Sequence, residues 1–495
     1  MKIVTIILFY LFFSYISFAQ TANYKIQQAI EAFSKEEGLE NAAISFMAYN
    51  LKKDSVIASF NSQMAIPSAS ITKLFSTALA LEVLGKNYRP KTEIYYDGEI
   101  DSLGILHGNI IVRGLGDPTL GSRFFYKREE RDTFLSDWVL ALSKLGIQSI
   151  DGRIIADGSA FGYMGVPDGW TWSDMGNYYG AGASACAIYD NMTYLHFSTS
   201  NEVNGTTSID SLSPPISGLR IFNQVTTSNA SGDNSYIYGA PYSLDWIAIG
   251  NLPRNKTNFE VKASIPDPEL LLAQVFQDAM TKSGISVAYP AIGWRSVLTD
   301  SEDSLKIGSI LDYTKLKLLL TYSGKSIEEI VRWTNLQSVN FFAEQLLNLV
   351  AFEKLKKTNF STSASYANNY WSGRLDVTMF QTDGSGLSRN NAFSANHFVQ
   401  LLKYMYKSKN FVDFENSLPV AGKSGTLTSV CRGQVAQGKL KAKSGTLNRV
   451  KSYAGYIDNI SGDKIAFSIT VNNFNIPSSQ MVKKMERIFN LLTEM

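Results

Sequence analysis

Hydrophobic and polar positions along the chain change their period several times, and both ends of the chain contain strands and a helix. Residues 23–35 and the residues from Ser478 onward have the spacing of amphipathic helices. Alternation typical of strands occurs twice near each end, at 42–50, 55–60, 452–457 and 464–472. Helical patterns lie between these ends. The pattern therefore predicts one α+β body, an antiparallel sheet with helices, built from sequence-distant parts.

The residues after Pro67 predict a largely buried helix. Apolar side chains recur at helical spacing from Ile71 to Leu81, and the pattern ends at Gly85. Ser70 is therefore expected in the first turn of this helix.

The stretch from about 89 to 310 has a different pattern and is interpreted as inserted material. Short strands, such as 109–112 and 154–156, alternate with turns rich in Gly, Asp and Pro. Residues 190–262 are rich in Ser, Asn and Thr and contain short alternating segments, which predicts a small β-domain within the insertion. The amphipathic pattern at 268–283 predicts a helix that returns toward the larger body.

The chain is longer than one hydrophobic core usually supports. It has 495 residues, whereas single cores rarely extend beyond roughly 250–300 residues. After the insertion, we expect a short apolar run at 316–321 and helices from Ser326 and Asn340. The predicted division is a signal peptide at 1–19, a main domain at 20–88 plus 313–495, an inserted domain at 89–189 plus 263–312, and a small β-domain at 190–262.

The N-terminal residues have the composition of a secretory signal peptide. Lys2 precedes an apolar run at 3–13, which is too short to span a membrane as a helix. Ser17 and Ala19 supply the small side chains that a signal peptidase needs, and Gln20 stands where a lipoprotein would have Cys. An uncleaved anchor is the alternative. We expect a mature chain without a stable membrane span, secreted to the periplasm or cell envelope.

Composition and charge exclude several other classes of protein. The chain is 45% hydrophobic and 18% charged, an ordinary globular balance, and its net charge of +2 gives no electrostatic reason to expect a nucleic-acid partner. Cys186 and Cys431 allow at most one disulfide, and their different contexts favour two buried thiols. His107, His196 and His397 lack the spacing of metal ligands, so we predict no metal site and no cofactor.

Two motifs place a hydroxyl beside an amine or an amide. In an SxxK tetrapeptide, Ser70 and Lys73 share one face of the predicted helix. A lysine amine kept neutral by burial can accept the proton of the hydroxyl, which is otherwise a weak nucleophile. In an SxN tripeptide, Ser338 can relay a proton to the leaving amine, and the amide of Asn340 can orient Lys73. Alone, these motifs also fit a solvated helix start and a helix cap.

A third motif, Lys443-Ser444-Gly445-Thr446, precedes an apolar strand. Gly445 permits close approach of a backbone, Lys443 and the two hydroxyls can bind a terminal carboxylate, and an edge strand here can pair with an extended peptide. The same tetrapeptide occurs at 423–426, but only the second copy is followed by an apolar strand, which favours Lys443. SxxK, SxN and K-[ST]-G in this order are the signature of penicillin-recognising serine acyltransferases.

With these motifs, the chain resembles the class C low-molecular-mass penicillin-binding proteins, the D-alanyl-D-alanine carboxypeptidase/endopeptidase family, over nearly all of its mature length. Further segments that carry the resemblance are 67–73, 114–120, 167–170, 383–388, 418–422 and 425–427. In that family the segment that 425–427 resembles is not catalytic. Ser444 replaces the usual Thr and keeps the hydroxyl, and Val339 replaces an Asp whose side chain does not reach into the site.

The resemblance implies a penicillin-recognising serine transpeptidase-like domain interrupted by one or two smaller, strand-rich domains. These would fill the 268 residues (338 − 70) that separate Ser70 from Ser338, an interval far longer than in compact β-lactamases. The family's oxyanion hole corresponds to the backbone N–H groups of Ser70 and Thr446. Asp174 and Arg389 fall where related enzymes bind the charged end of the peptidoglycan side chain. A turn cap and a surface ion pair are their alternative roles.

Together these features predict a serine-type D-Ala-D-Ala carboxypeptidase and/or DD-endopeptidase that acts on peptidoglycan stem peptides and is inhibited by β-lactams. The expected catalytic residues are Ser70, Lys73, Ser338, Asn340 and Lys443. The expected substrate-binding residues are Ser444, Gly445, Thr446, Asp174 and Arg389. A β-lactamase-like hydrolase and a non-catalytic cell-wall binding protein are the alternatives, and the intact catalytic set argues against the second.

Overall fold

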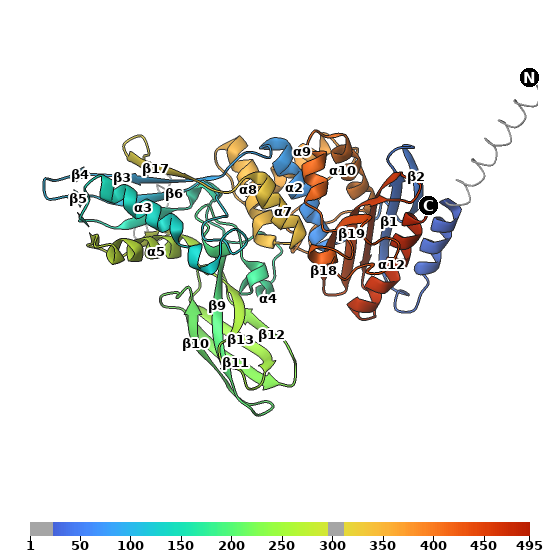
Figure 1. Ribbon diagram of the computed structural model, residues 1–495, viewed down its shortest axis with the longest axis horizontal. Helices are drawn as coiled ribbons and strands as arrows, with labels where there is room; N and C mark the ends of the chain where they lie inside the picture. The colour runs from blue at the N-terminus through green and yellow to red at the C-terminus, as the bar shows by residue number, and fades with distance from the viewer. Residues whose placement is uncertain (1–22, 296–310) are drawn as a thin grey trace, which may run out of the picture.

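The computed structural model describes residues 23–295 and 311–495 (Figure 1). The predicted signal peptide at 1–19 lies outside the described residues. Figure 1 shows an elongated molecule with both ends of the described chain in one body, which we call the main body. A second body with α3 and α5 forms the opposite end, and a small β-body containing β9–β13 projects from the side.

A five-stranded antiparallel sheet forms the centre of the main body. Its order is β18 (Leu440–Leu447), β19 (Val450–Asp458), β20 (Lys464–Asn472), β1 (Ala43–Asn50) and β2 (Ser55–Phe60). β20 pairs with β1 along the whole of β1, so the two ends of the chain share one sheet. This confirms the predicted α+β body built from sequence-distant parts.

The edge strand β18 differs from what the sequence pattern indicated. The third motif was expected to precede a strand, but Lys443 and Thr446 lie inside β18 itself, paired with Ala454 and Lys451 of β19. The short hairpin after Leu447 makes this pairing possible, because it returns the chain directly alongside itself. Among the described strands β18 pairs only with β19. Its other edge is bridged to Val420 at Lys441, and from Lys443 onward it has no backbone pairing with the described residues.

Helices cover both faces of this sheet. Residues 23–33 and α12 (Ser478–Thr493) pack on one face, against Tyr453 and Ile457 of β19. Ala454 and Tyr456 point to the other face, because successive strand residues alternate. That face is covered by a helical layer made of α2 (Lys73–Val83), α7 (Ile327–Leu336), α8 (Asn340–Leu355), α9 (Phe360–Ser372), α10 (Ala395–Lys407) and α11 (Phe411–Asn416).

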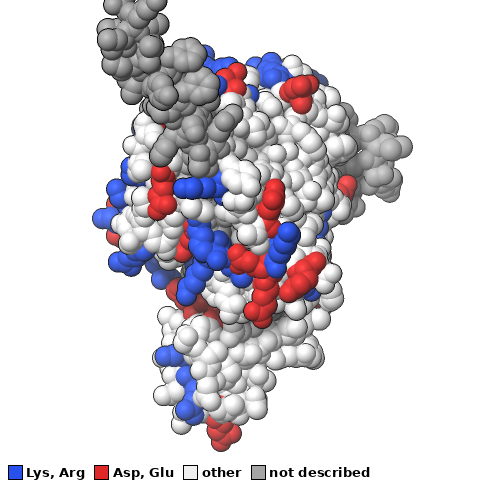
Figure 2. Space-filling model, turned by 90° about the vertical axis from the view of Figure 1, so that its right-hand side faces the viewer, with Lys and Arg blue, Asp and Glu red and all other residues white. Residues whose placement is uncertain are grey.

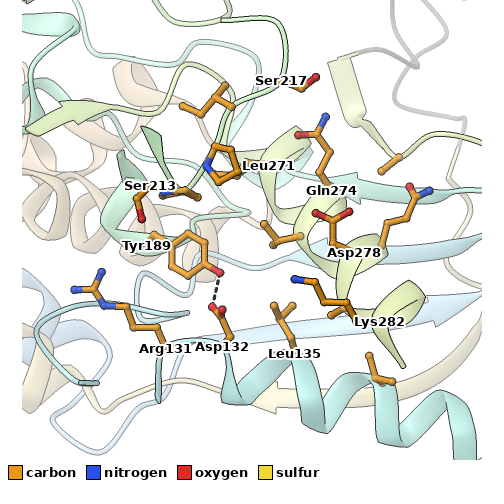
Figure 3. A pocket seen from close by; sticks show the side chains of 18 of the residues that line it. Arg131, Asp132, Leu135, Tyr189, Ser213, Ser217, Leu271, Gln274, Asp278 and Lys282 are labelled. Carbon is orange, nitrogen blue, oxygen red and sulfur yellow. Dashed lines mark hydrogen bonds between the residues drawn. The ribbon is translucent and has the colours of Figure 1, made fainter. Parts of the chain in front are cut away.

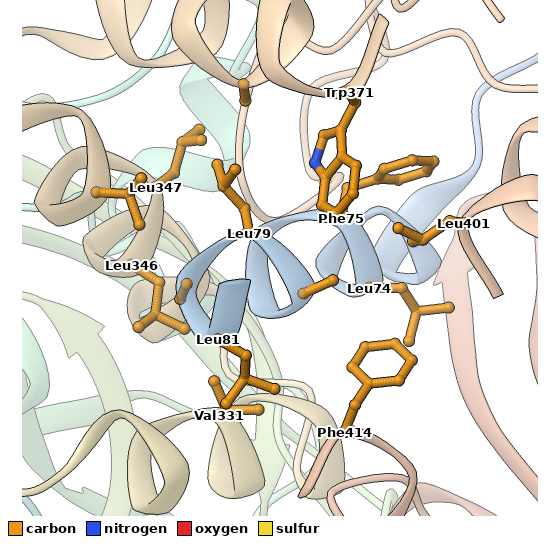
Figure 4. Close-up of a cluster of buried hydrophobic side chains, with 14 of the residues drawn as sticks. Leu74, Phe75, Leu79, Leu81, Val331, Leu346, Leu347, Trp371, Leu401 and Phe414 are labelled. Carbon is orange, nitrogen blue, oxygen red and sulfur yellow. The ribbon is translucent and has the colours of Figure 1, made fainter. Parts of the chain in front are cut away.

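The helix α2 runs through the centre of this layer and is buried from its first residue to Leu81 (Figure 4). Phe75 stacks on Phe393 with ring centroids 4.9 Å apart, and it meets the edge of Trp371 at 6.0 Å. Removing such a buried aromatic side chain typically costs about 3–5 kcal/mol of stability. The start of α2 is therefore held rigidly, which matters for the residues it carries.

The second body contains two sheets with α3 (Thr133–Lys144) and α5 (Pro268–Lys282) packed against them. One sheet has the order β16 (Ile292–Gly293), β8 (Ile154–Asp157), β6 (Ile110–Gly114), β3 (Lys91–Tyr96) and β17 (Lys317–Ser323). The other has the order β15 (Ser286–Val287), β7 (Ser149–Ile150), β5 (Ile105–His107) and β4 (Glu99–Ile100). The predicted strands near 110 and 154 and the predicted helix at 268–283 are present as β6, β8 and α5.

The small β-body consists of two three-stranded sheets that enclose their own apolar core, with Phe197 and Trp246 fully buried. One sheet has the order β10 (Thr207–Ser213), β9 (Met192–Thr199) and β14 (Phe259–Ser264). The other has the order β11 (Arg220–Ser228), β13 (Asp245–Pro253) and β12 (Asn234–Tyr238).

The strand pairing bears on one predicted domain bound. The sequence pattern assigned residues from 313 onward to the main domain, whereas β17 pairs with β3 of the second body. This pairing joins residues more than 200 positions apart, so local periodicity carries no signal for it. We propose that the chain returns to the main body after Ser323, where α7 begins, and the remaining bounds stay predictions.

Cys186 and Cys431 are both free and buried, in separate apolar cores, which confirms the prediction of two thiols. Over residues 23–295 and 311–495, no helix combines the length and hydrophobicity needed to cross a bilayer. Figure 2 shows Lys and Arg interspersed with Asp and Glu on the face it presents, as the small net charge suggests.

Candidate active site

Ser70 lies in a tight turn that leads into the buried helix α2. The turn is η1 (Ala69–Thr72), a 3-10 turn just ahead of α2 rather than the first turn of α2 itself. Ala69 has a φ of +51°, which a non-glycine residue keeps only where its surroundings impose it. A Cβ at Gly445 would lie 2.9 Å from the backbone N of Ser70, and one at Gly386 would overlap the Ala69 carbonyl. Both glycines therefore fix this turn, and Ser70 stays half-buried.

The amine of Lys73 lies among three oxygen atoms. Its Nζ is 2.9 Å from Ser70 Oγ. It is also 2.6 Å from Asn340 Oδ1 and 2.7 Å from the Ser385 carbonyl oxygen. These last two oxygens only accept hydrogen bonds. A neutral amine has two N–H donors and one lone pair, so donation to both acceptors directs the lone pair toward the Ser70 hydroxyl.

Burial favours this neutral form of Lys73. The side chain is fully buried, and loss of hydration lowers its pKa to about 7, although the charges of Asp383 and Glu344 oppose the shift. A substantial fraction of Lys73 is therefore unprotonated near neutral pH, as a proton acceptor requires.

Lys443 lies on the edge strand β18, next to Ser338. Its Nζ donates to Ser338 Oγ at 2.8 Å and to the Ser444 carbonyl at 2.7 Å. Burial, and then the positive charges of Lys73 and Lys451, hold the pKa of Lys443 well below its usual value. All of these effects disfavour the charged form of Lys443. A bound anion would oppose them and raise the pKa again.

The SxN motif forms the junction between α7 and α8. Ser338 has a φ of +58°, a second left-handed residue beside the site. Asn340 begins α8, and its Nδ2 donates to the Tyr179 carbonyl at 2.8 Å while its Oδ1 contacts Lys73. Val339 packs against the helical core, so the position that departs from the family pattern does not reach the lysines.

The two K-S-G-T copies adjoin but have different surroundings. Lys443 is fully buried on β18, whereas Lys423 is exposed ahead of the short turn η7 (Gly425–Leu427). The copies meet where Ser444 Oγ donates to Thr426 Oγ1 at 2.8 Å. Thr446 is exposed at the open side of β18. The two copies thus differ in burial and in contacts, and the choice of Lys443 as the functional lysine stays a prediction.

The two residues expected to bind the substrate side chain are not joined to each other. Asp174 caps the short helix α4 (Trp172–Met175), accepting from Thr171 Oγ1 at 2.7 Å, which was its alternative role. Arg389 is exposed, and its side chain has no hydrogen bond or ion pair with residues in the described part of the chain. Their role in binding stays a prediction.

Sequence reasoning missed the residues that support Lys73 from behind. Glu344 is fully buried, one helical turn after Asn340, and accepts from the backbone N–H groups of Gly384 and Ser385. Asp383 accepts from Trp170 Nε1 at 2.9 Å. The signal available was a charged residue within the apolar stretch of α8, a position that usually requires a partner.

A cavity of about 1090 Å³ lies away from this site, between α3, α5 and the small β-body (Figure 3). Tyr189 and Asp132 are hydrogen-bonded to each other at its wall, and Arg131, Gln274 and Lys282 also line it. None of the residues that surround Ser70, Lys73 or Lys443 contributes to its lining.

The sequence matches a known protein family over most of its length. Residues 26–494 match the D-Ala-D-Ala carboxypeptidase 3 (S13) family. The chain belongs to this family. The catalytic type predicted from the motifs, a serine hydrolase acting on D-Ala-D-Ala, is thereby confirmed.

Two relatives match over most of their length. The chain is 25% identical over 452 residues to the D-alanyl-D-alanine carboxypeptidase DacB of Haemophilus influenzae, covering 88% of this chain and 86% of the relative. It is 25% identical over 471 residues to a D-alanyl-D-alanine carboxypeptidase of Actinomadura sp., covering 93% and 83%. The fold matches the crystal structure of penicillin binding protein 4 (dacB) from H. influenzae with a TM-score of 0.77, at 22% identity and with coverage of 94% of this chain and 99% of that one.

Proposed function

We propose that this enzyme is secreted to the cell envelope and trims peptidoglycan stem peptides by acyl transfer through Ser70. The observation that carries this proposal is the position of Lys73 Nζ, 2.9 Å from Ser70 Oγ and bonded to two oxygens that only accept. Family membership identifies D-Ala-D-Ala as the substrate class. The predicted signal peptide supports action outside the cytoplasm.

In the acylation step, Ser70 Oγ bonds to the carbonyl carbon of the penultimate D-alanine, and its proton passes to the lone pair of Lys73. The carbonyl oxygen becomes an oxyanion, which the backbone N–H groups of Ser70 and Thr446 stabilise. When the C–N bond breaks, Ser338 delivers a proton to the departing amine, and the proton that Lys73 accepted replaces it, so that both groups return to their starting forms. Water then adds to the ester carbonyl, which releases the peptide carboxylate and restores the Ser70 hydroxyl.

Lys443 binds the carboxylate of the terminal residue in this proposal. Burial, and then the neighbouring amines of Lys73 and Lys451, disfavour its ammonium form, and a bound carboxylate would favour that form again. The same contact explains inhibition by β-lactams, which present a strained amide and a carboxylate at a similar spacing. Free D-alanine and the amine of a cross-linked stem peptide are both leaving groups of this mechanism. Digestion of defined peptidoglycan fragments, followed by mass spectrometry, measures the preference.

Intact-mass analysis after incubation with benzylpenicillin tests the proposal. We expect one adduct per chain in the wild type, none on Ser70→Ala, and a normal adduct on Ser424→Ala, the serine of the other K-S-G-T copy. Release of D-alanine from a D-Ala-D-Ala peptide should follow the same order. If Ser70→Ala acquires the adduct at the wild-type rate, Ser70 is not the nucleophile. Rapid turnover of benzylpenicillin instead of a lasting adduct would favour a β-lactamase.

A further inference from the structure

The segment Gly384–Ser385 is held between α8 and α2 through its peptide groups. Both of its N–H groups donate to Glu344, from Gly384 to Oε2 at 3.0 Å and from Ser385 to Oε1 at 2.7 Å. Both of its carbonyls face α2. The Gly384 carbonyl accepts from Ser76 Oγ at 2.7 Å, and the Ser385 carbonyl accepts from Lys73 Nζ at 2.7 Å. The segment therefore links the Glu344 carboxylate to the Lys73 amine.

The Glu344 carboxylate is fully buried behind this segment and contacts neither Ser70 nor Lys73 directly. It lies one helical turn after Asn340, which contacts Lys73 itself. The helix α8 thus supports Lys73 twice, once directly and once through the peptide segment. A buried carboxylate is costly unless its oxygens are hydrogen-bonded, and here each oxygen has a backbone partner.

We propose that Glu344 is a positioning residue, whose two carboxylate oxygens fix the Gly384–Ser385 segment so that the Ser385 carbonyl holds the Lys73 amine against Ser70. Without this contact, a neutral Lys73 has only one acceptor-only partner, and its lone pair is no longer directed at the hydroxyl. The inference deepens the proposed function, on which it rests, by naming the residue that orients its base.

Opposing effects act on the charge of Glu344. Burial, and then the charge of Asp383, raise the pKa of Glu344 to about 8, while its backbone hydrogen bonds oppose the shift. The Glu344 charge in turn favours the protonated form of Lys73. Each oxygen of Glu344 accepts a backbone N–H, and two accepting oxygens are the arrangement of the ionised carboxylate.

Three variants of the full chain test the proposal. Glu344→Gln retains the size of the side chain but has one acceptor oxygen, so one of the two backbone N–H groups meets an NH₂ donor and is left unpaired. Glu344→Asp keeps two acceptor oxygens and draws them back by one methylene. The matched control is Gln345→Ala, because Gln345 is the next residue of α8, equally buried, and bonded to the Ser184 carbonyl instead.

The assay is rapid-mixing acylation by benzylpenicillin, resolved into the acylation rate constant k2 and the non-covalent dissociation constant K. We expect Glu344→Gln to lower k2 by roughly ten- to a hundred-fold, the scale of a lost charge-assisted hydrogen bond, with K changed by less than about three-fold. Glu344→Asp should recover part of k2. Gln345→Ala should lower the melting temperature and leave k2 near the wild-type value.

A wild-type k2 in Glu344→Gln, or an equal loss in Gln345→Ala, would overturn the proposal. If Glu344→Gln does not fold, the k2 of Glu344→Asp decides. Endpoint labelling of the wild type at Ser70 separates the two levels of inference. Absence of that label refutes the proposed function, whereas a labelled wild type with unimpaired Glu344 variants refutes only the positioning role.

Discussion

The two K-S-G-T copies allow a matched test of how the enzyme recognises its substrate. Lys443 and Lys423 have identical following residues and lie in adjoining segments, yet one side chain is fully buried beside Ser338 and the other is exposed. We predict that Lys443→Ala severely impairs acylation by benzylpenicillin and that Lys423→Ala leaves it within a few-fold.

The magnitude follows from the contacts of each lysine. A charge-assisted hydrogen bond to a carboxylate contributes about 1.5–3 kcal/mol, and about 1.4 kcal/mol corresponds to a ten-fold change, so Lys443→Ala should lower k2/K by roughly ten- to a hundred-fold. Lys423 is not among the hydrogen-bond partners of Ser70 or Lys73. Substitution of such an exposed residue usually changes the free energy of unfolding by less than about 0.5 kcal/mol.

The assay is stopped-flow acylation, with thermal unfolding of both variants measured alongside. The unfolding control separates loss of carboxylate binding from loss of structure, because Lys443→Ala also removes the hydrogen bond to Ser338. Equal losses of k2/K for the two variants would refute the assignment, and a larger loss for Lys423→Ala would transfer the carboxylate site to the first copy.

Two further predictions concern pH and substrate choice. Acylation should fall roughly ten-fold per pH unit below about pH 7, because the proton acceptor Lys73 has a pKa of about 7 and is protonated on the acid side. A flat profile of k2/K from pH 5 to 8 would contradict its role as the base. Asp174→Ala and Arg389→Ala should each lower kcat/KM on a diaminopimelate-containing peptide by roughly ten-fold or more, with acylation by benzylpenicillin little changed. Parallel losses on both substrates would indicate a structural role, and no loss on the peptide would place side-chain recognition elsewhere.

The order of the three motifs could be predicted from the sequence, and so could the helices that follow the first two, because each pattern is local. Burial of the helix after Ser70 follows from its apolar spacing, and the start of a helix at Asn340 follows from the pattern of α8. The strand β18 was harder to predict, since Lys443 and its neighbours combine charge, small residues and glycine instead of alternating apolar positions. Its strand conformation depends on pairing with β19, a tertiary contact.

The supports of Lys73 could not be predicted from local patterns. The Ser385 carbonyl that contacts Lys73 comes from a residue 312 positions away, and any residue type can supply a backbone carbonyl. Glu344 was the exception, because a carboxylate within an apolar helix indicates a buried partner even when the partner is unknown. The sequence therefore indicates that Glu344 is unusual, while the fold is needed to identify what it holds.

The site buries two lysines whose surroundings differ in the sign of the nearest charges. Lys73 has carboxylates within electrostatic range, Asp383 and Glu344, which limit the fall of its pKa and keep it close to neutral pH. Around Lys443 no carboxylate opposes the effect of burial, and the neighbouring groups that lower its pKa further are two lysines, Lys73 and Lys451. A substrate carboxylate would thus complete the charge balance at Lys443 alone. Because the resulting ion pair has no net charge, its formation leaves Lys73 near the pKa that proton transfer requires. Substrate binding and proton acceptance can then proceed on neighbouring lysines without one disabling the other.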